Sequence, residues 1–288
     1  MTGSPRKNQR GVAVVLAMGV VALAAIAAAA MLASQSTWAR HAELTAEHMQ
    51  AQALVHAGVD WARALLSDDR RVSNVDHLGE PWALRLPPVP VDNGQLAGQI
   101  DDQQAAFNLN NVVRNGVVSP AQLAQFHRLL EILGLPDALA GALTGWLRPP
   151  DPAPARTLVD VAELALVSGF DAAARTRLRP FVTALPRFTA VNVNTASPEV
   201  LAAVIEGLDL DGARELAAQR SRAYFRNRAD FIARLPAGAV AGGNDIATST
   251  DFFQASVRVT IGAAQARGTA LLAREAAGWP AVVWRKYP

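Results

Sequence analysis

An uninterrupted run of uncharged residues near the N-terminus constrains this chain more than any other feature. No charged side chain occurs between Arg10 and Arg40, and residues 12–33 are apolar apart from Gly19. As an α-helix this run would extend about 33 Å, enough to cross a hydrocarbon layer of about 30 Å. A helix in the core of a soluble protein usually carries a polar stripe, which this run lacks. The run therefore predicts a membrane helix or a secretory signal peptide.

The residues around the run bear on that choice. The apolar part of a signal peptide usually has about 7–15 residues and is shorter than this run, although residues 28–30, all alanine, would offer a cleavage site. Arg6, Lys7 and Arg10 precede the run, so the N-terminus is expected to stay in the cytoplasm while the bulk of the chain crosses. The change from polar to apolar character falls at Gly11.

Helical periodicity continues beyond the apolar run. Residues 38–66 contain no proline and a single glycine, and polar residues fill much of one face. The apolar residues recur at spacings of three, four and five, and they are Leu44, Met49, Ala53, Leu54, Ala57, Trp61 and Leu65. One helix is therefore predicted from about residue 12 to about residue 66, apolar on all sides in its first half and amphipathic in its second. The Ser-Asp-Asp sequence at residues 67–69 is predicted to end it.

Composition excludes several functional classes. With 288 residues and 51% hydrophobic side chains, the chain is long enough to form a core outside the membrane. The formal net charge is +2, but the first 11 residues hold three basic residues and no acid, so the remainder has 24 basic and 25 acidic residues. This balance is not typical of a nucleic-acid-binding protein. The absence of cysteine excludes disulfides and cysteine chemistry.

The rest of the chain alternates between strand and helix signals. Prolines and a 92–94 turn indicate an irregular crossing after the first helix, and residues 95–113 predict a hairpin with its turn at Asp101-Asp102. A series of helix signals follows over residues 119–236, beginning with Ser119 as N-cap and a proline after it. The middle of the chain therefore predicts a large helical insert.

Strand signals return at the C-terminal end. β-Forming residues are frequent after residue 251, and turns are predicted at Arg267-Gly268 and Ala277-Gly278. The sheet would then be built from strands on both sides of the helical insert, with the first helix lying across it. This is an α+β arrangement.

Motifs along nearly the whole chain resemble one family in order and spacing. They are the basic leader ending in glycine, EPWAL, FNLNNV, LVDVAELALVSGF, LRPFVTALP, VNVNTASPEVLAAV, TSTDFFQASVRV and VVWR. Together they resemble the type IV pilin-like minor pseudopilin K of type II secretion systems. The resemblance implies an α+β fold with a pilin-like long N-terminal helix on an antiparallel sheet and a large all-α insert of helix-hairpin-helix or SAM-like type. The implied divisions are leader 1–11, membrane half 12–34, first pilin-like part 35–118, insert 119–236 and C-terminal strands 237–288.

The resemblance also implies how the N-terminus is processed and where the protein acts. A prepilin peptidase would cut after Gly11 and N-methylate Val12, and the protein would be a single-pass inner-membrane protein with a cytoplasmic N-terminus and a periplasmic C-terminal domain. Most pilin-like proteins carry glutamate at the fifth mature position, where this chain has Leu16. That absence resembles the subunit at the tip of the fibre, which forms a complex with minor pseudopilins I and J, contacts the other pseudopilins and supports export without being an enzyme.

Two other functions are compatible with parts of the sequence. VNVNTASPEVLAAV also resembles the start of helix-hairpin-helix DNA-binding modules, including membrane-anchored DNA-uptake receptors. Those modules need backbone amides close to phosphate, whereas Glu206, Asp209 and Asp211 place three acids at the matching hairpin. We therefore predict no nucleic-acid partner. A periplasmic binding protein with a conventional signal peptide is the second alternative.

No motif indicates catalysis, and no cofactor is predicted to be required. His41, His48 and His56 are seven and eight residues apart, too far for a paired i,i+4 metal site, and no serine lies in a Gly-x-Ser-x-Gly motif. Calcium is a possible ligand because pilin-like relatives bind it in loops of the globular part. Asp245, Thr248 and Asp251, together with Asn244 and Ser249 beside them, offer the oxygen ligands that calcium prefers.

Overall fold

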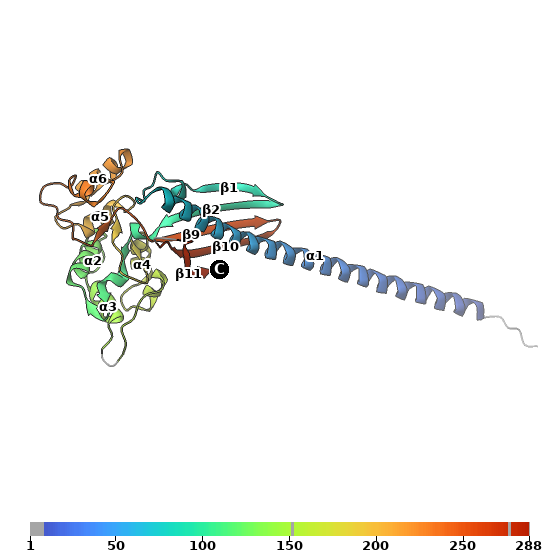
Figure 1. Cartoon of the computed structure of the whole chain (residues 1–288). Coiled ribbons are helices and arrows are strands. Elements are labelled where there is room, and N and C mark those ends of the chain that lie inside the picture. Colours follow the sequence, from blue (N-terminus) through green and yellow to red (C-terminus); the bar gives the residue numbers. More distant parts are fainter. Residues whose placement is uncertain (1–8, 151–152, 276–277, 288) are drawn as a thin grey trace, which may run out of the picture.

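A single long helix forms the N-terminal quarter of the protein. The computed structural model describes residues 9–150, 153–275 and 278–287, and helix α1 runs from Gln9 to Val72 over 64 residues, about 96 Å (Figure 1). The predicted single helix is confirmed, but its predicted end at residues 67–69 is wrong. Asp69 lies inside the helix and pairs with Arg274 at 2.7 Å, and two arginines in the last turn suit the negative end of the helix dipole.

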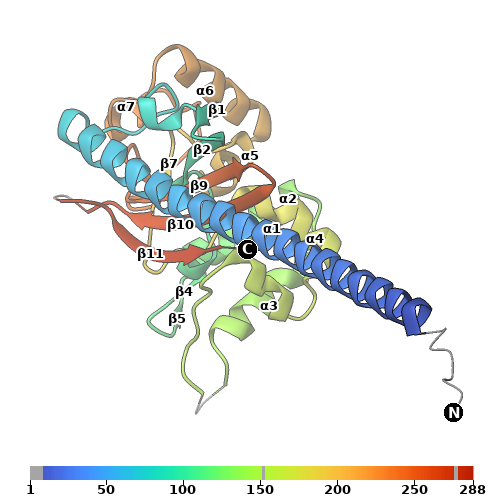
Figure 2. The same ribbon diagram turned by 90° about the vertical axis from the view of Figure 1, so that its right-hand side faces the viewer.

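The two halves of α1 have different surroundings. Residues 11–46 are exposed throughout, whereas one face of the following turns is buried against the sheet. The buried side chains are Ala51, Val55, Val59, Ala62 and Leu66. Glycines allow the helix and the sheet to approach closely: a Cβ on Gly268 would lie 2.4 Å from a methyl group of Val55. Figure 2 shows α1 lying across the sheet, as predicted for the α+β fold.

The sheet has five antiparallel strands in the order β1-β2-β9-β10-β11. Their bounds are Leu86–Val91 for β1, Gly94–Asp102 for β2, Phe252–Ile261 for β9, Ala264–Ala273 for β10 and Ala281–Lys286 for β11. Strands from before and after the insert therefore lie side by side, with β2 paired to β9 along its whole length. The prediction that strands from both sides of the insert build the sheet is confirmed. The second strand predicted for the first hairpin is wrong, because Phe107 and Asn108 pair with residues 182–183 inside the insert.

The positions of two predicted turns are wrong. The first hairpin is β1–β2, with its turn at Asp92-Asn93, where Asn93 has a positive φ of 57°. The chain does not turn at Asp101-Asp102, because β2 continues to Asp102 and pairs with β9 before leaving the sheet. Aspartate is common in turns, but Asp102 is buried and accepts hydrogen bonds from the insert.

The second error concerns residues 267–268, which lie inside β10 and pair with β9. The β9–β10 turn falls instead at Gly262, which has a positive φ of 51°. Glycine at position 268 marks the close approach of α1 rather than a turn. Of the third predicted turn, Ala277 lies outside the described residues, and Gly278 has a positive φ of 97°.

Both edges of the sheet are interrupted. Edge strand β1 contains Pro87, Pro88 and Pro90, which cannot donate backbone hydrogen bonds, and its register shifts between Leu86 and Val89. Edge strand β11 has a register shift where it pairs with residues 271 and 272 of β10. Such irregularities disfavour pairing with a strand of another chain.

The region between β2 and β9 leaves the sheet and forms a helical insert with its own hydrophobic core. Its helices are α2 Pro120–Ile132, α3 Ala138–Leu147, α4 Ala172–Leu178, α5 Pro198–Val204, α6 Leu210–Arg222 and α7 Arg228–Ile232. They lie inside the predicted insert range of 119–236, and short strands and turns extend the off-sheet region to residues 103–251. Figure 1 shows the insert beside the C-terminal end of α1, far from the N-terminus.

The insert consists of two repeats of one local architecture. The first begins with β3 (Phe107–Asn108) and ends with β6 (Val182–Thr183); the second begins with β7 (Val191–Asn192) and ends with β8 (Ile246–Ala247). In each repeat the first and last strands pair in parallel. In each, a Ser-Pro pair starts a helix, and the serine side chain accepts a hydrogen bond from the helix backbone.

Asparagines hold the two repeats in the same way. Asn110 forms two hydrogen bonds with the backbone of Leu158, at 2.9 Å each. Asn194 does the same with Phe225, at 2.9 and 2.8 Å. In both cases the residue two positions after that partner caps a short helix. The FNLNN and VNVNT motifs are thus equivalent buried anchors of the two repeats.

Candidate functional site

The predicted processing site lies on the exposed start of α1. No atom outside the local helix lies within 4 Å of a Cβ placed on Gly11, and Val12 and Leu16 are 62% and 65% exposed. The first acidic residue of the whole chain is Glu43, so the first turns of α1 carry no carboxylate. The cleavage and methylation of this site stay predictions.

The apolar half of α1 meets the requirements of a membrane-spanning helix. Among the described residues, one helix is long and apolar enough to cross a membrane, and it starts near the N-terminus with no buried residue in its most apolar window. Its large side chains between residues 12 and 33 are all exposed in the isolated chain. Exposure of that much apolar surface to water would be unfavourable, so this half fits a single-pass membrane anchor.

The second half of α1 presents an exposed side opposite the sheet and an apolar flank beside β1. Met49 and Trp61 are 62% and 54% exposed, and Leu84 is 71% exposed. Trp61, Leu65, Leu84 and Leu86 line a shallow apolar groove between α1 and the β1–β2 hairpin. This flank offers apolar surface that a packed partner would bury.

The three histidines of α1 do not come together. His41 and His48 are exposed, and His48 lies 2.9 Å from the amide of Gln52. His56 contacts the hydroxyl of Tyr287 at 2.9 Å. These are surface and packing contacts, as the sequence spacing indicates.

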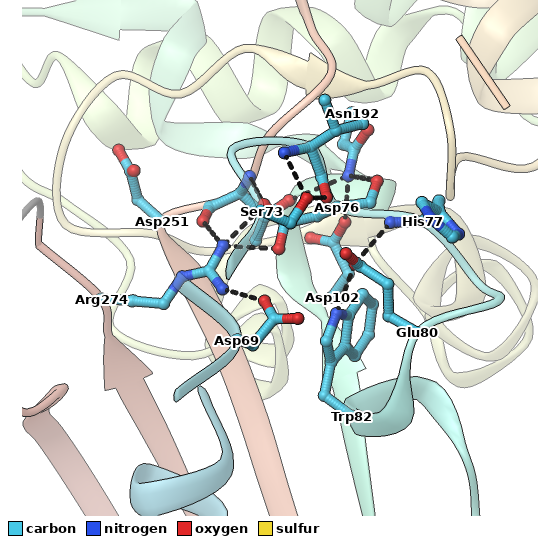
Figure 3. Close-up of polar contacts among 12 residues, drawn as sticks. Asp69, Ser73, Asp76, His77, Glu80, Trp82, Asp102, Asn192, Asp251 and Arg274 are labelled. Carbon is cyan, nitrogen blue, oxygen red and sulfur yellow. Dashed lines mark hydrogen bonds and ion pairs between the residues drawn. The ribbon is translucent and has the colours of Figure 1, made fainter. Parts of the chain in front are cut away.

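A buried polar junction lies where α1, the sheet and the insert meet (Figure 3). Arg274, at the end of β10, is 2% exposed. One of its terminal nitrogens donates to Asp69 at 2.7 Å, and the other donates to both oxygens of Asp76 at 2.5 and 2.6 Å and to the carbonyl of Thr250 at 2.9 Å. The guanidinium therefore joins the end of α1, the loop after it and the exit from the insert.

Two further carboxylates belong to the junction. Glu80 accepts hydrogen bonds from the backbone amide of His77 at 2.9 Å and from the indole nitrogen of Trp82 at 2.8 Å. Asp102 accepts from Asn192 at 2.9 Å and from the hydroxyl of Thr195 at 2.6 Å. Four buried or half-buried carboxyl groups thus lie at the junction, and two of them, Asp69 and Asp76, bind the guanidinium.

The pKa values of three of these carboxyl groups are raised. Burial, and then the charge of Glu80, raise the pKa of Asp69 to about 6 despite the pull of Arg274. Burial raises the pKa of Asp102 to about 6 against the hydrogen bonds that stabilise its charged form. Burial also raises the pKa of Asp76. The junction is therefore short of positive charge.

Asp69, Asp76 and Glu80 form the one group of three potential metal ligands found among the described residues, with ligand atoms all within 4.8 Å of one another. Two of the three already bind Arg274, which supplies a positive charge there. Acidic clusters are common without a metal, and this one carries no metal assignment. Its role is to hold chain segments together.

The three predicted calcium ligands take part in three separate contacts. Both carboxylate oxygens of Asp245 accept from the side-chain amides of Gln122 and Gln125, at 2.8 Å each. Asp251 pairs with Arg187 at 3.0 Å, while the carbonyl of Thr248 accepts from the amide of Asp76 at 2.9 Å. Calcium at Asp245, Thr248 and Asp251 stays a prediction.

Sequence reasoning missed the junction because its members are far apart in the chain. Arg274 and Asp76 are separated by 198 positions, and neither belongs to a motif with known spacing. Partial signals existed: EPWAL contains Glu80 and Trp82, and VNVNT contains Asn192. These motifs carry the family resemblance, but only the fold brings their residues together at the junction.

Comparison with known proteins decides the family. Two family models described as Type II secretion system (T2SS), protein K match residues 105–187 and 191–252, which correspond closely to the two repeats of the insert. Type II secretion system protein K of Pseudomonas aeruginosa is 35% identical, covering 89% of this chain and 86% of its own length. The chain belongs to the type II secretion system protein K family. The corresponding protein of Klebsiella pneumoniae is 32% identical, with 97% of both chains covered.

A solved structure supports the fold independently. The chain is similar to one in the crystal structure of the GspK–GspI–GspJ complex from the type 2 secretion system of enterotoxigenic Escherichia coli. The TM-score is 0.72 at 22% identity, and the match covers 86% of this chain and 99% of the other. This confirms the predicted α+β architecture with a long helix, an antiparallel sheet and a helical insert.

Proposed function

We propose that the chain is a minor pseudopilin at the tip of the periplasmic pseudopilus of a type II secretion system, where it supports protein export. The observation that carries the proposal is the exposed first half of α1 with Leu16 in place of an acid. The family-level comparisons support the same conclusion, because both curated relatives named above are protein K of such a system.

The missing acid has a physical reason at a tip. A carboxylate in the middle of a membrane costs roughly 2.5–3.5 kcal/mol on insertion scales. Inside a pilin-like fibre this cost is offset when the acid meets the charged N-terminal amine of the neighbouring subunit. A subunit at the tip has no neighbour above it whose amine needs neutralising. Leucine at position 16 avoids an unpaired acid.

The shape of the insert also favours a tip position. The insert projects beside the C-terminal end of α1, at the end far from the membrane helix (Figure 1). A body of this size cannot be repeated in every subunit of a tightly wound fibre without clashes. Because both sheet edges are interrupted, assembly through strand pairing is also disfavoured.

The partners we propose are minor pseudopilins I and J, by analogy with the complex of the similar Escherichia coli protein. The exposed side of the amphipathic half of α1 would supply much of this contact by helix-on-helix packing. Met49 and Trp61 on that half provide large apolar side chains for burial. Other pseudopilins of the fibre and the prepilin peptidase would contact the N-terminal half.

The proposed life cycle starts in the inner membrane. Residues 12–34 would span it once, with the N-terminus in the cytoplasm and the rest in the periplasm. A prepilin peptidase would then cut after Gly11 and methylate Val12. The role is structural rather than enzymatic. N-terminal sequencing of the mature protein tests this step: N-methylated Val12 is expected, and a terminus near residues 31–34 would indicate a conventional signal peptide instead.

Substitution of Leu16 by glutamate tests the tip assignment. Leu16→Glu is expected to leave cleavage unchanged, since the peptidase recognises the leader and Gly11. It should weaken assembly with I and J and reduce secretion, because an unpaired acid enters the membrane. Leu16→Gln is the control for size and polarity without charge, and it should act more mildly. A Leu16→Glu protein that secretes better than the parent, or a parent found at many positions along each fibre, would contradict the proposal.

Calcium at the loop before β9 is a separate proposal. Asp245, Thr248 and Asp251 would provide oxygen ligands only after at least one aspartate gives up its present partner. Calorimetric titration of the full chain with calcium, beside Asp251→Asn, tests it. Equal heats from the parent and the variant would exclude this loop as the site.

A further inference from the structure

The exit of the insert contacts one buried arginine. The chain enters the insert after Asp102, at the end of β2, and returns to the sheet through residues 248–251. Arg274 binds Asp69 of α1, Asp76 of the following loop and the carbonyl of Thr250 in the exit segment, all within 2.9 Å. Arg274 therefore links three separate segments of the chain.

Backbone hydrogen bonds reinforce the same place. The amide of Asp76 donates to the carbonyl of Thr248 at 2.9 Å, and the amide of Thr250 donates to the carboxylate of Asp76 at 2.7 Å. The amide of Arg274 donates to the carbonyl of Asp251 at 2.6 Å. The side chain and the backbone of Arg274 therefore hold consecutive residues of the exit segment against the end of β10.

The geometry requires arginine rather than a generic cation. A guanidinium is planar and donates in several fixed directions, so it can bind two carboxylates and a carbonyl simultaneously, whereas an ammonium is a compact charge on a flexible stem. The guanidinium carbon also lies 4.6 Å from the centre of the Phe253 ring. A lysine at this position would keep the charge but lose the fixed directions.

Besides Arg274, the buried side chains of Asn192 and Thr195 join the insert to Asp102 of the sheet, and the remaining contacts between insert and sheet are less constraining. The insert and the helix–sheet body have separate hydrophobic cores, bridged by a small cluster of Leu185, Phe252 and Leu271. An exposed ion pair of 2.5 Å joins Asp160 to Lys286. A cavity of about 450 Å³ lies between the insert and one face of the sheet. Within the part of the chain that the structure describes, no continuous apolar core therefore sets the angle between the insert and the helix–sheet body.

On the other side of the junction the contact is a surface stack. His77, in the loop after α1, stacks on Tyr224 of the insert with ring centroids 4.0 Å apart. Tyr224 is 42% exposed, so this stack alone cannot exclude water from the joint. The buried contacts of Arg274 are better placed than this stack to fix the orientation of the insert on the helix–sheet body.

We propose that Arg274 is a positioning residue that fixes the orientation of the insert on the helix–sheet body. Assembly or export steps that depend on the insert then require Arg274, whereas contacts made by the exposed side of α1 do not. The second statement rests on the proposed function, because it assumes a tip complex in which α1 carries the contact with I and J.

The absence of cysteine makes a distance measurement straightforward. In the full chain in detergent, spin labels on A57C and E215C report the distance from α1 to α6, and labels on E131C and E215C report a distance inside the insert. All three positions are exposed. The parent should give a narrow distribution for both pairs. Arg274→Lys should broaden the α1–α6 distribution at least twofold and leave the pair inside the insert unchanged.

A variant that lacks both Arg274 and its two acidic partners tests whether broadening comes from the lost contacts of Arg274 or from unpaired buried acids. Arg274→Met combined with Asp69→Asn and Asp76→Asn removes the cation and the two acids it binds. If Arg274 positions the insert, this triple variant stays as broad as Arg274→Lys. A narrow, parent-like distribution in the triple variant, or in Arg274→Lys, would overturn the proposal. If Arg274→Met alone fails to fold, these two variants still decide the question.

Co-purification with I and J and the level of secretion test whether export depends on the orientation of the insert. Arg274→Lys should still co-purify with I and J in the parent ratio while secretion falls at least fivefold. Parent-level secretion together with a broadened α1–α6 distance would overturn the dependence of export on orientation. A parent chain that does not co-purify with I and J would instead contradict the proposed function and leave the distance result standing.

Discussion

The two repeats of the insert share their internal architecture but differ in what they are attached to. In the first repeat, the side-chain amide of Asn108 binds the carbonyl of Arg187 and the hydroxyl of Thr189, both in the linker to the second repeat. In the second, the equivalent Asn192 binds the carbonyl of Asp76 and the carboxylate of Asp102, both in the helix–sheet body. The same anchor therefore closes the first repeat on the insert itself and the second on the body.

This difference indicates how the two repeats are attached to the helix–sheet body. The second repeat is the one that docks on the body through buried polar groups, and the first repeat is attached mainly through the second. Helices α2 and α5, one from each repeat, pack together, and Arg128 of the first repeat donates to the carbonyl of Ala203 in the second at 2.8 Å. Perturbing the second repeat should consequently disturb the junction, and perturbing the first should not.

Removing the second-repeat anchor should have the largest effect. Asn194→Ala leaves the buried amide and carbonyl of Phe225 without partners, and each unsatisfied group costs about 1–3 kcal/mol. We expect the free energy of unfolding of residues 40–288 to fall by about 4 kcal/mol in urea titrations. Truncation before residue 40 is suitable because residues 11–46 are exposed and add nothing to the core.

The first-repeat variant is the matched comparison. Asn110→Ala frees the backbone of Leu158 in the same way and the carbonyl of Leu185 as well, so its cost should be of the same order. Hydrogen exchange should distinguish the two: the amides of Asp76 and Thr250 should exchange faster in Asn194→Ala only. Asn244→Ala, at an exposed position, is the neutral control. Equal exchange at the junction in both variants would mean that the repeats are not attached differently.

The sequence predicted the parts of this molecule whose signals are local. The apolar run and the periodicity after it predicted α1, because both depend on neighbouring residues. The turn at Asp101-Asp102 was predicted wrongly because an aspartate pair is typical of turns, whereas Asp102 serves as a buried acceptor for Asn192 and Thr195. Arg274 carried no signal, because its partners come together only through the topology of the whole chain.

Glycine substitutions in the two helix–helix turns should differ in cost. Gly207 and Gly134 occupy equivalent turns with positive φ of 74° and 60°. A Cβ on Gly207 would lie 2.6 Å from the backbone oxygen of Gly238, whereas one on Gly134 would lie 3.4 Å from the flexible end of Arg177. Alanine costs about 1–2 kcal/mol in this left-handed region even without a clash.

We therefore expect Gly134→Ala to lower the free energy of unfolding by about 1 kcal/mol and Gly207→Ala by about 3 kcal/mol, because only the second must also move backbone. The Glu206–Val240 pairing holds that backbone in place. Urea titrations of both variants measure the difference. If Gly134→Ala proves the more costly of the two, the second repeat is not the more tightly constrained.

The junction should also make stability depend on pH. The pKa of Asp69 is raised to about 6 in the folded protein, so its favourable contribution is fully present below its ordinary value and is lost as the pH rises through about 6. Asp69→Asn has no carboxyl group at this position, so its stability does not fall in this way. Between pH 4 and pH 7 the parent should therefore lose about 1.5 kcal/mol of unfolding free energy relative to the variant, allowing for solvent screening.

Urea titrations at several pH values measure this shift, and Asp68→Asn, at an exposed neighbouring position, is the control. Among the described residues, Asp68 pairs with Arg71 alone, at the surface, so its variant should follow the parent. A parallel pH dependence in the parent and Asp69→Asn would show that Asp69 is not the group that titrates.

The smallest effect should come from the direct link between the first repeat and the sheet. Lys286 pairs with Asp160 at 2.5 Å, and the lysine side chain is 47% exposed. Exposed pairs contribute about 0–1 kcal/mol, because water screens the charges and two flexible side chains must be ordered. Lys286→Met should therefore lower the free energy of unfolding by less than about 1 kcal/mol and leave exchange at Thr250 unchanged. The Asp160 carboxylate also accepts from the amide of Ala162, so its segment keeps a cap when the lysine is lost. A loss as large as that of Asn194→Ala would mean that the first repeat is held on the body directly, and the order of attachment inferred from the asparagine anchors would have to be reversed.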